Sequence, residues 1–167
     1  MRILVLLLLT SIGFSAKAQF TVSCVDSTRF PDEYYPCPNT FNPVCACDNK
    51  TYRNDCAAYY WGGLNTNNLI APNSCTGFFI DFYPTAVTYF PATFNLYMKL
   101  PGPATLYIFD AFGRLQYQRN LNAYYNGQII TEEVPAENLQ LGIYTLIVLA
   151  AGEKQAIKFA KASDLEY

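Results

Sequence analysis

The stretch CPNTFNPVCACDNKTYRNDC, from Cys37 to Cys56, decides how the first half of this chain folds. It holds four of the six cysteines, and all six lie between Cys24 and Cys75. Only one residue separates Cys45 from Cys47, whereas structural zinc sites favour two to four. An even number of clustered cysteines in an exported chain predicts disulfides. We therefore expect a small module held by three disulfides, because such a segment is too short to be stabilised by apolar burial alone.

The N-terminus has the layout of an export signal. Arg2 gives a positive start, the apolar run Ile3–Phe14 follows, and Ala16-Lys17-Ala18 supplies a small-residue cleavage site. We predict a signal peptide over residues 1–18 and a secreted or cell-surface protein, with no transmembrane segment in the mature chain. An N-terminal membrane anchor is the alternative, but about a dozen apolar residues fall short of the ~20 that span a bilayer.

Composition excludes several classes of function. Apolar residues make up 51% and charged residues 14%, which is too apolar for a disordered chain. The formal net charge is −2, so nothing favours nucleic acid as a partner. The chain contains no His, which removes Ser-His-Asp and Cys-His catalysis and His-ligated metal sites. We expect neither an enzyme nor a cofactor.

The cysteine-free second half alternates short apolar runs with turn residues. Phe94, Leu96, Met98 and Leu100 are expected to share one strand face, and Asn126-Gly127 is a strong hairpin signal. About seven such runs predict an antiparallel, immunoglobulin-like β-sandwich over residues 76–161, followed by a tail over 162–167. The predicted strands are Phe78–Tyr83, Thr93–Leu100, Thr105–Asp110, Leu115–Asn120, Gln128–Val134, Ile143–Leu149 and Gln155–Ala160.

The cysteine-containing segment resembles the Kazal family of serine-protease inhibitors across residues 24–75, within a module that we place at 19–75. Its cysteine pattern is atypical, because Tyr59 stands where the family has a cysteine and Cys47 is additional. The resemblance implies a small disulfide-rich α+β fold. The matching features are the seven residues between Cys37 and Cys45, Pro43-Val44-Cys45, Asp48, and Thr51-Tyr52-x-Asn54-x-Cys56.

The Kazal resemblance also implies a disulfide pattern. It pairs Cys37 with Cys56 and Cys45 with Cys75. The resemblance then leaves Cys24 and Cys47 for each other, and that bridge is an inference only, because six cysteines allow 15 pairings.

The resemblance further implies a reactive-site loop that enters a protease cleft. Its residues are Pro38, Asn39, Thr40 and Phe41, with Asn39–Thr40 as the reactive bond and Asn54 supporting the loop backbone. Family members also include copies that inhibit nothing and serve as spacers or binding modules.

A short helix is expected directly after this supporting residue. Asn54 is a good N-cap, and Gly62-Gly63 is a good terminator. Tyr59, Tyr60 and Trp61 are expected to pack beside the helix, with a recognition patch as the alternative reading.

Residues 77–161 resemble the C-terminal sorting domain of proteins exported by the type IX secretion system of Bacteroidetes-type bacteria. The resemblance implies that outer-membrane secretion machinery recognises this domain. The matching features, in order, are Phe82-Tyr83-Pro84, the strand and turn Leu106–Arg114, Leu141-Gly142-Ile143-Tyr144, and the basic strand Gln155–Lys161.

The two resemblances together predict an exported bacterial protein in which a sorting domain delivers a Kazal-like module. Its role is protein binding or structural, and active serine-protease inhibition is the alternative. The expected partner of the module is a serine protease or another extracellular protein.

Overall fold

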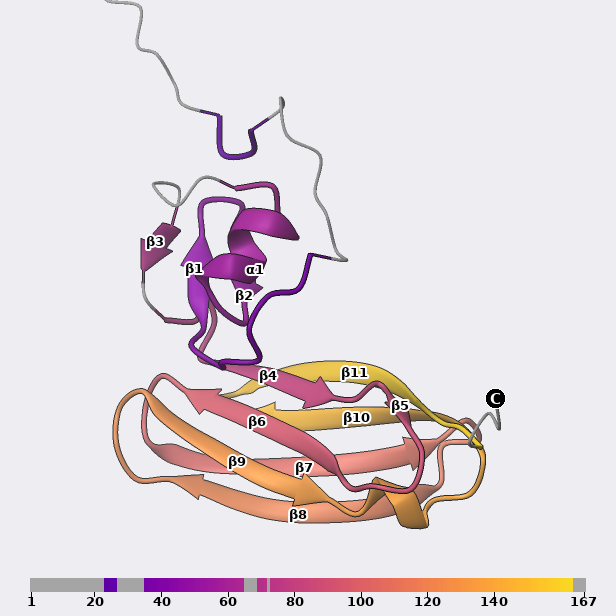
Figure 1. Ribbon diagram of the computed structural model, residues 1–167. Helices are drawn as coiled ribbons and strands as arrows, with labels where there is room; N and C mark the ends of the chain where they lie inside the picture. Colours follow the sequence, from indigo (N-terminus) through magenta and orange to yellow (C-terminus); the bar gives the residue numbers. More distant parts are fainter. Residues whose placement is uncertain (1–22, 27–34, 65–68, 72, 164–167) are drawn as a thin grey trace, which may run out of the picture.

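The computed structural model describes residues 23–26, 35–64, 69–71 and 73–163. The predicted signal peptide, residues 1–18, and the last four residues of the predicted tail lie outside this description. Figure 1 shows that the chain forms two parts, one after the other. We call β1–β3 and α1 the disulfide-rich part, and β4–β11 the two-sheet part.

The disulfide-rich part is built around one small antiparallel sheet with strand order β2-β1-β3. A helix packs beside this sheet, and four buried apolar residues form the core: Val44, Ala46, Ala58 and Leu64. The elements are β1 (Val44–Ala46), β2 (Thr51–Tyr52), α1 (Asp55–Tyr60) and β3 (Leu69–Ala71).

Helix α1 begins and ends where the sequence predicts. The side chain of Asn54 caps it by accepting a 2.8 Å hydrogen bond from the backbone N–H of Ala57. Gly63 follows with a φ of +65°, which a residue with a side chain rarely adopts. Gly62 also has no room for a side chain, because a Cβ there would lie 2.6 Å from the Tyr52 hydroxyl.

The two-sheet part contains a five-stranded sheet, ordered β5-β11-β10-β7-β8, and a three-stranded sheet, ordered β4-β6-β9. Neighbouring strands are antiparallel except β5 and β11, which are parallel. The elements are β4 (Phe78–Tyr83), β5 (Ala86–Val87), β6 (Ala92–Met98), β7 (Gly102–Asp110), β8 (Leu115–Ala123), β9 (Gln128–Val134), the 3-10 helix η2 (Ala136–Asn138), β10 (Gly142–Ala150) and β11 (Glu153–Lys161).

The core of the two-sheet part lies between the two sheets. One cluster of 20 buried residues draws on strands of both sheets. Alternation puts Phe94, Leu96 and Met98 into this cluster from β6, as the sequence predicts, and Leu106 and Ile108 from β7. Each sheet therefore buries one face against the other.

The structure corrects three details of the predicted strands. Asn126-Gly127 does not form a hairpin, because β8 and β9, on either side of it, belong to different sheets. Leu100 does not share the buried face of β6: the strand ends at Met98, and Leu100 is 63% exposed. The short strand β5 was not predicted, since two residues carry no periodicity.

Candidate functional site

Three disulfides connect the elements of the disulfide-rich part. They join Cys37 to Cys56 and Cys45 to Cys75, the two pairs that the family resemblance implies, and Cys24 to Cys47, the two cysteines that it leaves over. Cys37–Cys56 attaches the beginning of the predicted loop to helix α1, and Cys45 lies on β1. Residues 38–44 are therefore held at both ends by covalent bonds.

Between these anchors, the predicted loop lies at the surface of the molecule. Pro38, Asn39 and Thr40 are exposed, and Phe41 is half-buried. A single buried side chain, that of Asn54, holds the loop from behind. Its Nδ2 donates to the Pro38 carbonyl at 3.0 Å and to the Thr40 carbonyl at 2.8 Å.

These two carbonyls lie on either side of Asn39, so the amide of Asn54 spans the Asn39–Thr40 bond. The other end of the same amide group, Oδ1, caps helix α1. One side chain thus fixes the loop to the helix. A buried amide that satisfies three backbone groups is costly to replace, because each group would lose its partner away from water.

Arg53, next in the chain to Asn54, contacts the loop from a second direction. Its Nη2 donates to the carbonyl oxygen of Asn39 at 3.3 Å, and its own backbone carbonyl accepts from Asn42 at 2.8 Å. The same Nη2 lies 3.2 Å from Oδ2 of Asp81, on strand β4 of the two-sheet part. Arg53 therefore joins the loop to the neighbouring part of the molecule.

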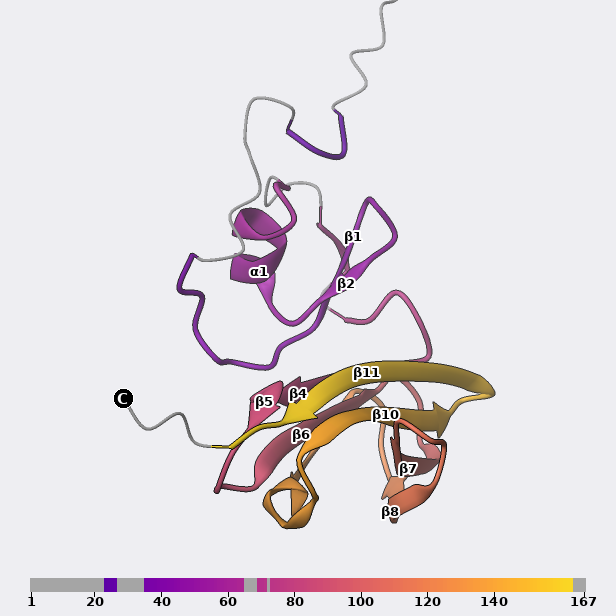
Figure 2. The same cartoon turned by 90° about the vertical axis from the view of Figure 1, so that its right-hand side faces the viewer.

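Phe41 makes the second contact between the parts. Its ring is stacked on that of Phe79, with 6.0 Å between centroids and an interplanar angle of 8°. Phe79 and Asp81 lie two residues apart on β4, so both point to the same side of the strand. Figures 1 and 2 both show the lower end of the disulfide-rich part lying over β4.

The sequence analysis missed this contact. Arg53, Phe79 and Asp81 were not singled out, because each fits an ordinary strand or connector. The only available signal is that Phe79 breaks the alternation of β4, because its aromatic ring occupies an outward position that normally carries a polar group. Nothing in the sequence connects these residues to the loop.

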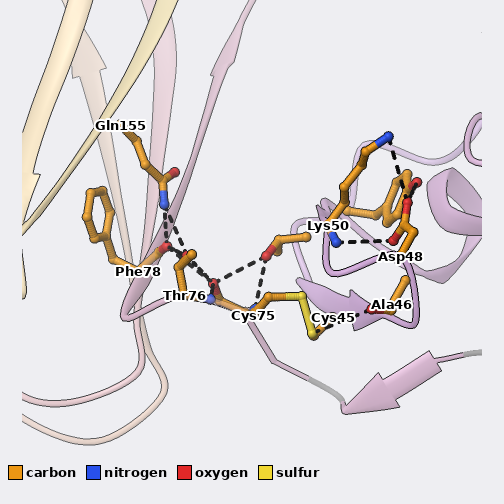
Figure 3. Close-up of a disulfide and its surroundings, with 11 residues drawn as sticks. Cys45, Ala46, Asp48, Lys50, Cys75, Thr76, Phe78 and Gln155 are labelled. Atoms are coloured by element: carbon orange, nitrogen blue, oxygen red, sulfur yellow. Dashed lines mark hydrogen bonds and ion pairs between the residues drawn. A yellow bond between two sulfur atoms is a disulfide. The ribbon is translucent and has the colours of Figure 1, made fainter.

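Hydrogen bonds also fix the short connection between the two parts (Figure 3). The backbone N–H of Cys75 donates to the Thr51 hydroxyl at 3.0 Å. Further along, Thr76 Oγ1 and Gln155 Nε2 both donate to the Phe78 carbonyl, at 2.5 and 2.6 Å. The connection from Cys75 to Phe78 is thus hydrogen-bonded to β2 at one end and to β11 at the other, which sets the orientation of one part on the other.

Asp48 and Tyr52 stabilise the β1–β2 turn, opposite the loop. Asp48 accepts from the Lys50 backbone N–H at 3.1 Å and from the Tyr52 hydroxyl at 2.8 Å. Burial raises the pKa of Tyr52 to about 12, and the hydrogen bond to Asp48 and its negative charge act in the same direction. Tyr52 therefore remains a neutral hydrogen-bond donor at physiological pH.

The aromatic residues at the end of α1 pack against the segment that precedes the loop. Tyr60 stacks on Tyr35 with 3.4 Å between centroids, and Tyr59 meets Tyr60 edge-on at 4.7 Å. The indole N–H of Trp61 donates to the Tyr35 carbonyl at 3.0 Å. This arrangement agrees with the packing role expected for the three residues.

Neither a metal site nor a membrane-spanning helix is found within residues 23–26, 35–64, 69–71 and 73–163. Within those ranges, no group of three or more His, Cys, Asp or Glu side chains is placed to hold a metal ion. No helix in the described part of the chain is long and apolar enough to cross a membrane.

The comparison with protein families agrees with the geometry of the loop and its disulfides. Residues 24–58 match the Kazal-type serine protease inhibitor domain, whose family is inhibitory rather than catalytic. No curated protein matches the chain. Five of the six cysteines lie inside the matched segment, and the sixth, Cys75, is bonded to one of them. The family match over residues 24–58 and the three disulfides support a Kazal-like domain in the disulfide-rich part, which suggests a protease-inhibitor-like or protein-binding module.

Proposed function

We propose that the disulfide-rich part is a protein-binding module whose partner is a serine protease, with Pro38, Asn39, Thr40 and Phe41 as the binding loop. The reactive bond is Asn39–Thr40. The module occupies residues 19–75, of which the described residues from 23 onward carry the argument.

One observation carries this proposal: the amide of Asn54 holds the Pro38 and Thr40 carbonyls on either side of the reactive bond. A loop held in this way is preorganised, so little conformational entropy is lost when a protease binds it. The same restraint opposes hydrolysis, because the two products of cleavage stay in place and the bond can re-form.

The side chain of Asn39 sets which protease is bound. This side chain is exposed and makes no hydrogen bond with a described residue, whereas the backbone carbonyl of Asn39 accepts from Arg53. Trypsin-like pockets take Lys or Arg and chymotrypsin-like pockets take large apolar groups. The target is therefore a protease whose primary pocket accepts a small polar amide.

We further propose that residues 76–161 form an immunoglobulin-like β-sandwich that serves as a type IX sorting domain, after export directed by the signal peptide 1–18. Two structural features support the sandwich fold on which this role depends, and both lie in the segments that resemble the sorting family. Asp110 organises the β7–β8 turn by accepting from the backbone N–H groups of Phe112 and Arg114, both at 2.9 Å. Tyr144, at the start of β10, donates to the Gln140 carbonyl at 2.8 Å, as tyrosines at strand ends do in such sandwiches.

The inhibitor function is tested by replacing Asn39 with residues that suit the primary pockets of well-characterised proteases. The oxidised chain from residue 19 onward, carrying Asn39→Arg, is titrated against trypsin, and the Asn39→Leu chain against chymotrypsin. We expect stoichiometric inhibition at equilibrium by at least one, with slow cleavage only between residues 39 and 40. A folded chain that inhibits neither enzyme contradicts the proposal.

A matched control separates the loop from the helix. In the Asn39→Arg background, Asn54→Ser keeps an N-cap oxygen but is too short to reach the loop carbonyls. This variant is expected to be cleaved as an ordinary substrate.

The sorting role needs a different test. A reporter protein that carries the signal peptide 1–18 at its N-terminus and residues 76–161 at its C-terminus is expressed in a bacterium with a type IX system. We expect the reporter at the cell surface or in the medium, and retention in the periplasm would contradict the sorting role.

A second candidate function has its own supporting observation. Phe41 and Arg53 contact the two-sheet part, so the loop already has an intramolecular partner. A purely structural module that joins the two parts would use its loop in this way and would inhibit no protease.

A further inference from the structure

The predicted binding loop lies against the two-sheet part of its own chain. Phe41 is stacked on Phe79, and Arg53 lies between the carbonyl of Asn39 and the carboxylate of Asp81. Phe41 is the second residue beyond the reactive bond, and Arg53 contacts the carbonyl of this bond. A protein that binds the reactive bond would therefore meet β4 close by.

A serine protease needs the same groups. The carbonyl oxygen of the reactive bond has to enter the oxyanion hole, where it accepts hydrogen bonds from the enzyme. In this chain that oxygen belongs to Asn39, and it already accepts from Arg53 at 3.3 Å. Phe41, the second residue beyond the bond, would have to lie along the cleft, and one face of its ring is covered by Phe79.

The side chains at this contact are largely removed from solvent. Arg53 and Asp81 keep only 13% and 20% of their side-chain exposure. The connection from Cys75 to Phe78 is hydrogen-bonded to Gln155 and Thr51, which restricts how the two parts can rotate. The contact is therefore a defined arrangement of the folded chain.

The contact is also imperfect. Arg53 Nε and Asp81 Oδ2 are buried, and neither has a hydrogen-bond partner of good geometry among the described residues. Asp81 Oδ2 keeps its ion pair with Arg53 Nη2 at 3.2 Å, but burying polar atoms without a hydrogen bond costs free energy, and this cost offsets part of the gain from the ion pair and the ring stack. The contact is therefore weaker than one in which every buried polar atom is hydrogen-bonded.

We propose that the two-sheet part masks the loop: strand β4 competes with the protease for Phe41 through Phe79 and, through the carboxylate of Asp81, holds Arg53 against the Asn39 carbonyl, so binding requires this contact to open. The proposal rests on the inhibitor function proposed above. In an intact chain the module binds its protease less tightly than it does once the contact with β4 is lost. Loss of the two-sheet part, or displacement of β4 from the loop, releases a stronger inhibitor.

The test uses the full chain from residue 19 onward with Asn39→Arg, so that trypsin is the probe. The masked chain is compared with one that also carries Phe79→Ala and Asp81→Asn. In the substituted chain, separating the loop from β4 no longer breaks an aromatic stack and a partly buried ion pair. We therefore expect the inhibition constant to fall about tenfold to a hundredfold. Association is expected to accelerate as well, because a larger fraction of the chain is open.

Matched controls lie on the same sheet. Ile129 and Glu133, on β9, occupy the outward face that Phe79 and Asp81 share, by their register with β6. Ile129→Ala and Glu133→Gln remove a similar apolar group and the same charge. They are expected to leave the inhibition constant within about twofold.

The outcomes separate the two proposals. Equal inhibition by the masked and the unmasked chain overturns masking and leaves the inhibitor function intact. Absence of inhibition from both folded chains overturns the inhibitor function and masking with it. Strengthening by the two control substitutions as well would also overturn masking, because the effect would then not come from β4.

Discussion

The two parts of this molecule reach stability by different routes. The disulfide-rich part has a core of four buried residues and three disulfides, whereas the two-sheet part has a core of 20 buried residues and contains no cysteine. Burial rises with the size of the core, so the larger part needs no cross-link and the smaller part depends on them. A core of four residues cannot hold a loop rigidly at both ends. The difference therefore explains why the predicted loop lies in the part whose disulfides anchor it.

Reduction of the disulfides should separate the stabilities of the two parts most strongly. The Cys45–Cys75 bridge alone closes a sequence separation of 30 residues, for which chain entropy gives about 4 kcal/mol. We expect the disulfide-rich part to unfold in reductant while the two-sheet part stays folded. Limited proteolysis with mass spectrometry, with and without reductant, should show new cleavage before residue 75 only. Cleavage within β6 or β10 would mean that the two parts do not stabilise themselves separately.

A cavity in the larger core should produce the reverse pattern. Phe94 is fully buried on β6, and Phe94→Ala is expected to lower the free energy of unfolding of the two-sheet part by about 3–5 kcal/mol. Strand unfolding is followed by far-UV circular dichroism. The single Trp, Trp61, reports on the disulfide-rich part by fluorescence.

The matched substitution for this cavity is Phe90→Ala, because Phe90 is 79% exposed and its loss should cost less than about 0.5 kcal/mol. If the Trp61 transition moves as far as the strand transition in Phe94→Ala, the two parts unfold as one unit.

The next prediction concerns the residue that joins loop and helix within the smaller part. Asn54→Ala removes an N-cap worth about 1 kcal/mol and two hydrogen bonds worth about 1 kcal/mol each. Asn54→Ser keeps the cap, so we expect it to recover about 1 kcal/mol relative to Ala while the loop stays unsupported. Trp61 fluorescence in denaturant measures the stability. Equal stability of the two variants would show that the helix cap contributes nothing.

The sequence predicts local features of both parts well. Asn54 and Gly62-Gly63 placed the helix correctly because capping depends on residues next to one another in the chain. The strands β4 and β9 have the predicted bounds because their alternation marks one buried face. Strand β7 begins earlier than expected, at Gly102, because a glycine and a proline there weaken the strand signal.

Features that depend on the packing of distant segments could not be predicted. Asn126-Gly127 favours a tight turn, but the turn type does not decide which sheet the next strand joins. Likewise, nothing local to Phe41 or Arg53 indicates that Phe79 and Asp81 lie opposite them. The residues of the predicted loop are a hypothesis that rests on family resemblance, and their contacts with β4 emerge only from the folded structure.

The smallest expected effect concerns the two-sheet part, where the charge of Asp110 stabilises the β7–β8 turn. Burial opposes ionisation of Asp110, but hydrogen bonds from Arg114 and Phe112, with the charge of Arg114, outweigh it and lower the pKa of this carboxyl. A carboxyl whose pKa is lower in the folded state stabilises the fold above its unfolded pKa, and this contribution disappears as the pH falls through the folded value. Asp110→Asn keeps an oxygen that accepts from Phe112 but removes the charge. We therefore expect a small decrease in melting temperature at pH 7 that shrinks below about pH 4 and in high salt. A difference between the two chains that grows as the pH falls would contradict this assignment, since a group protonated in both states contributes nothing from its charge.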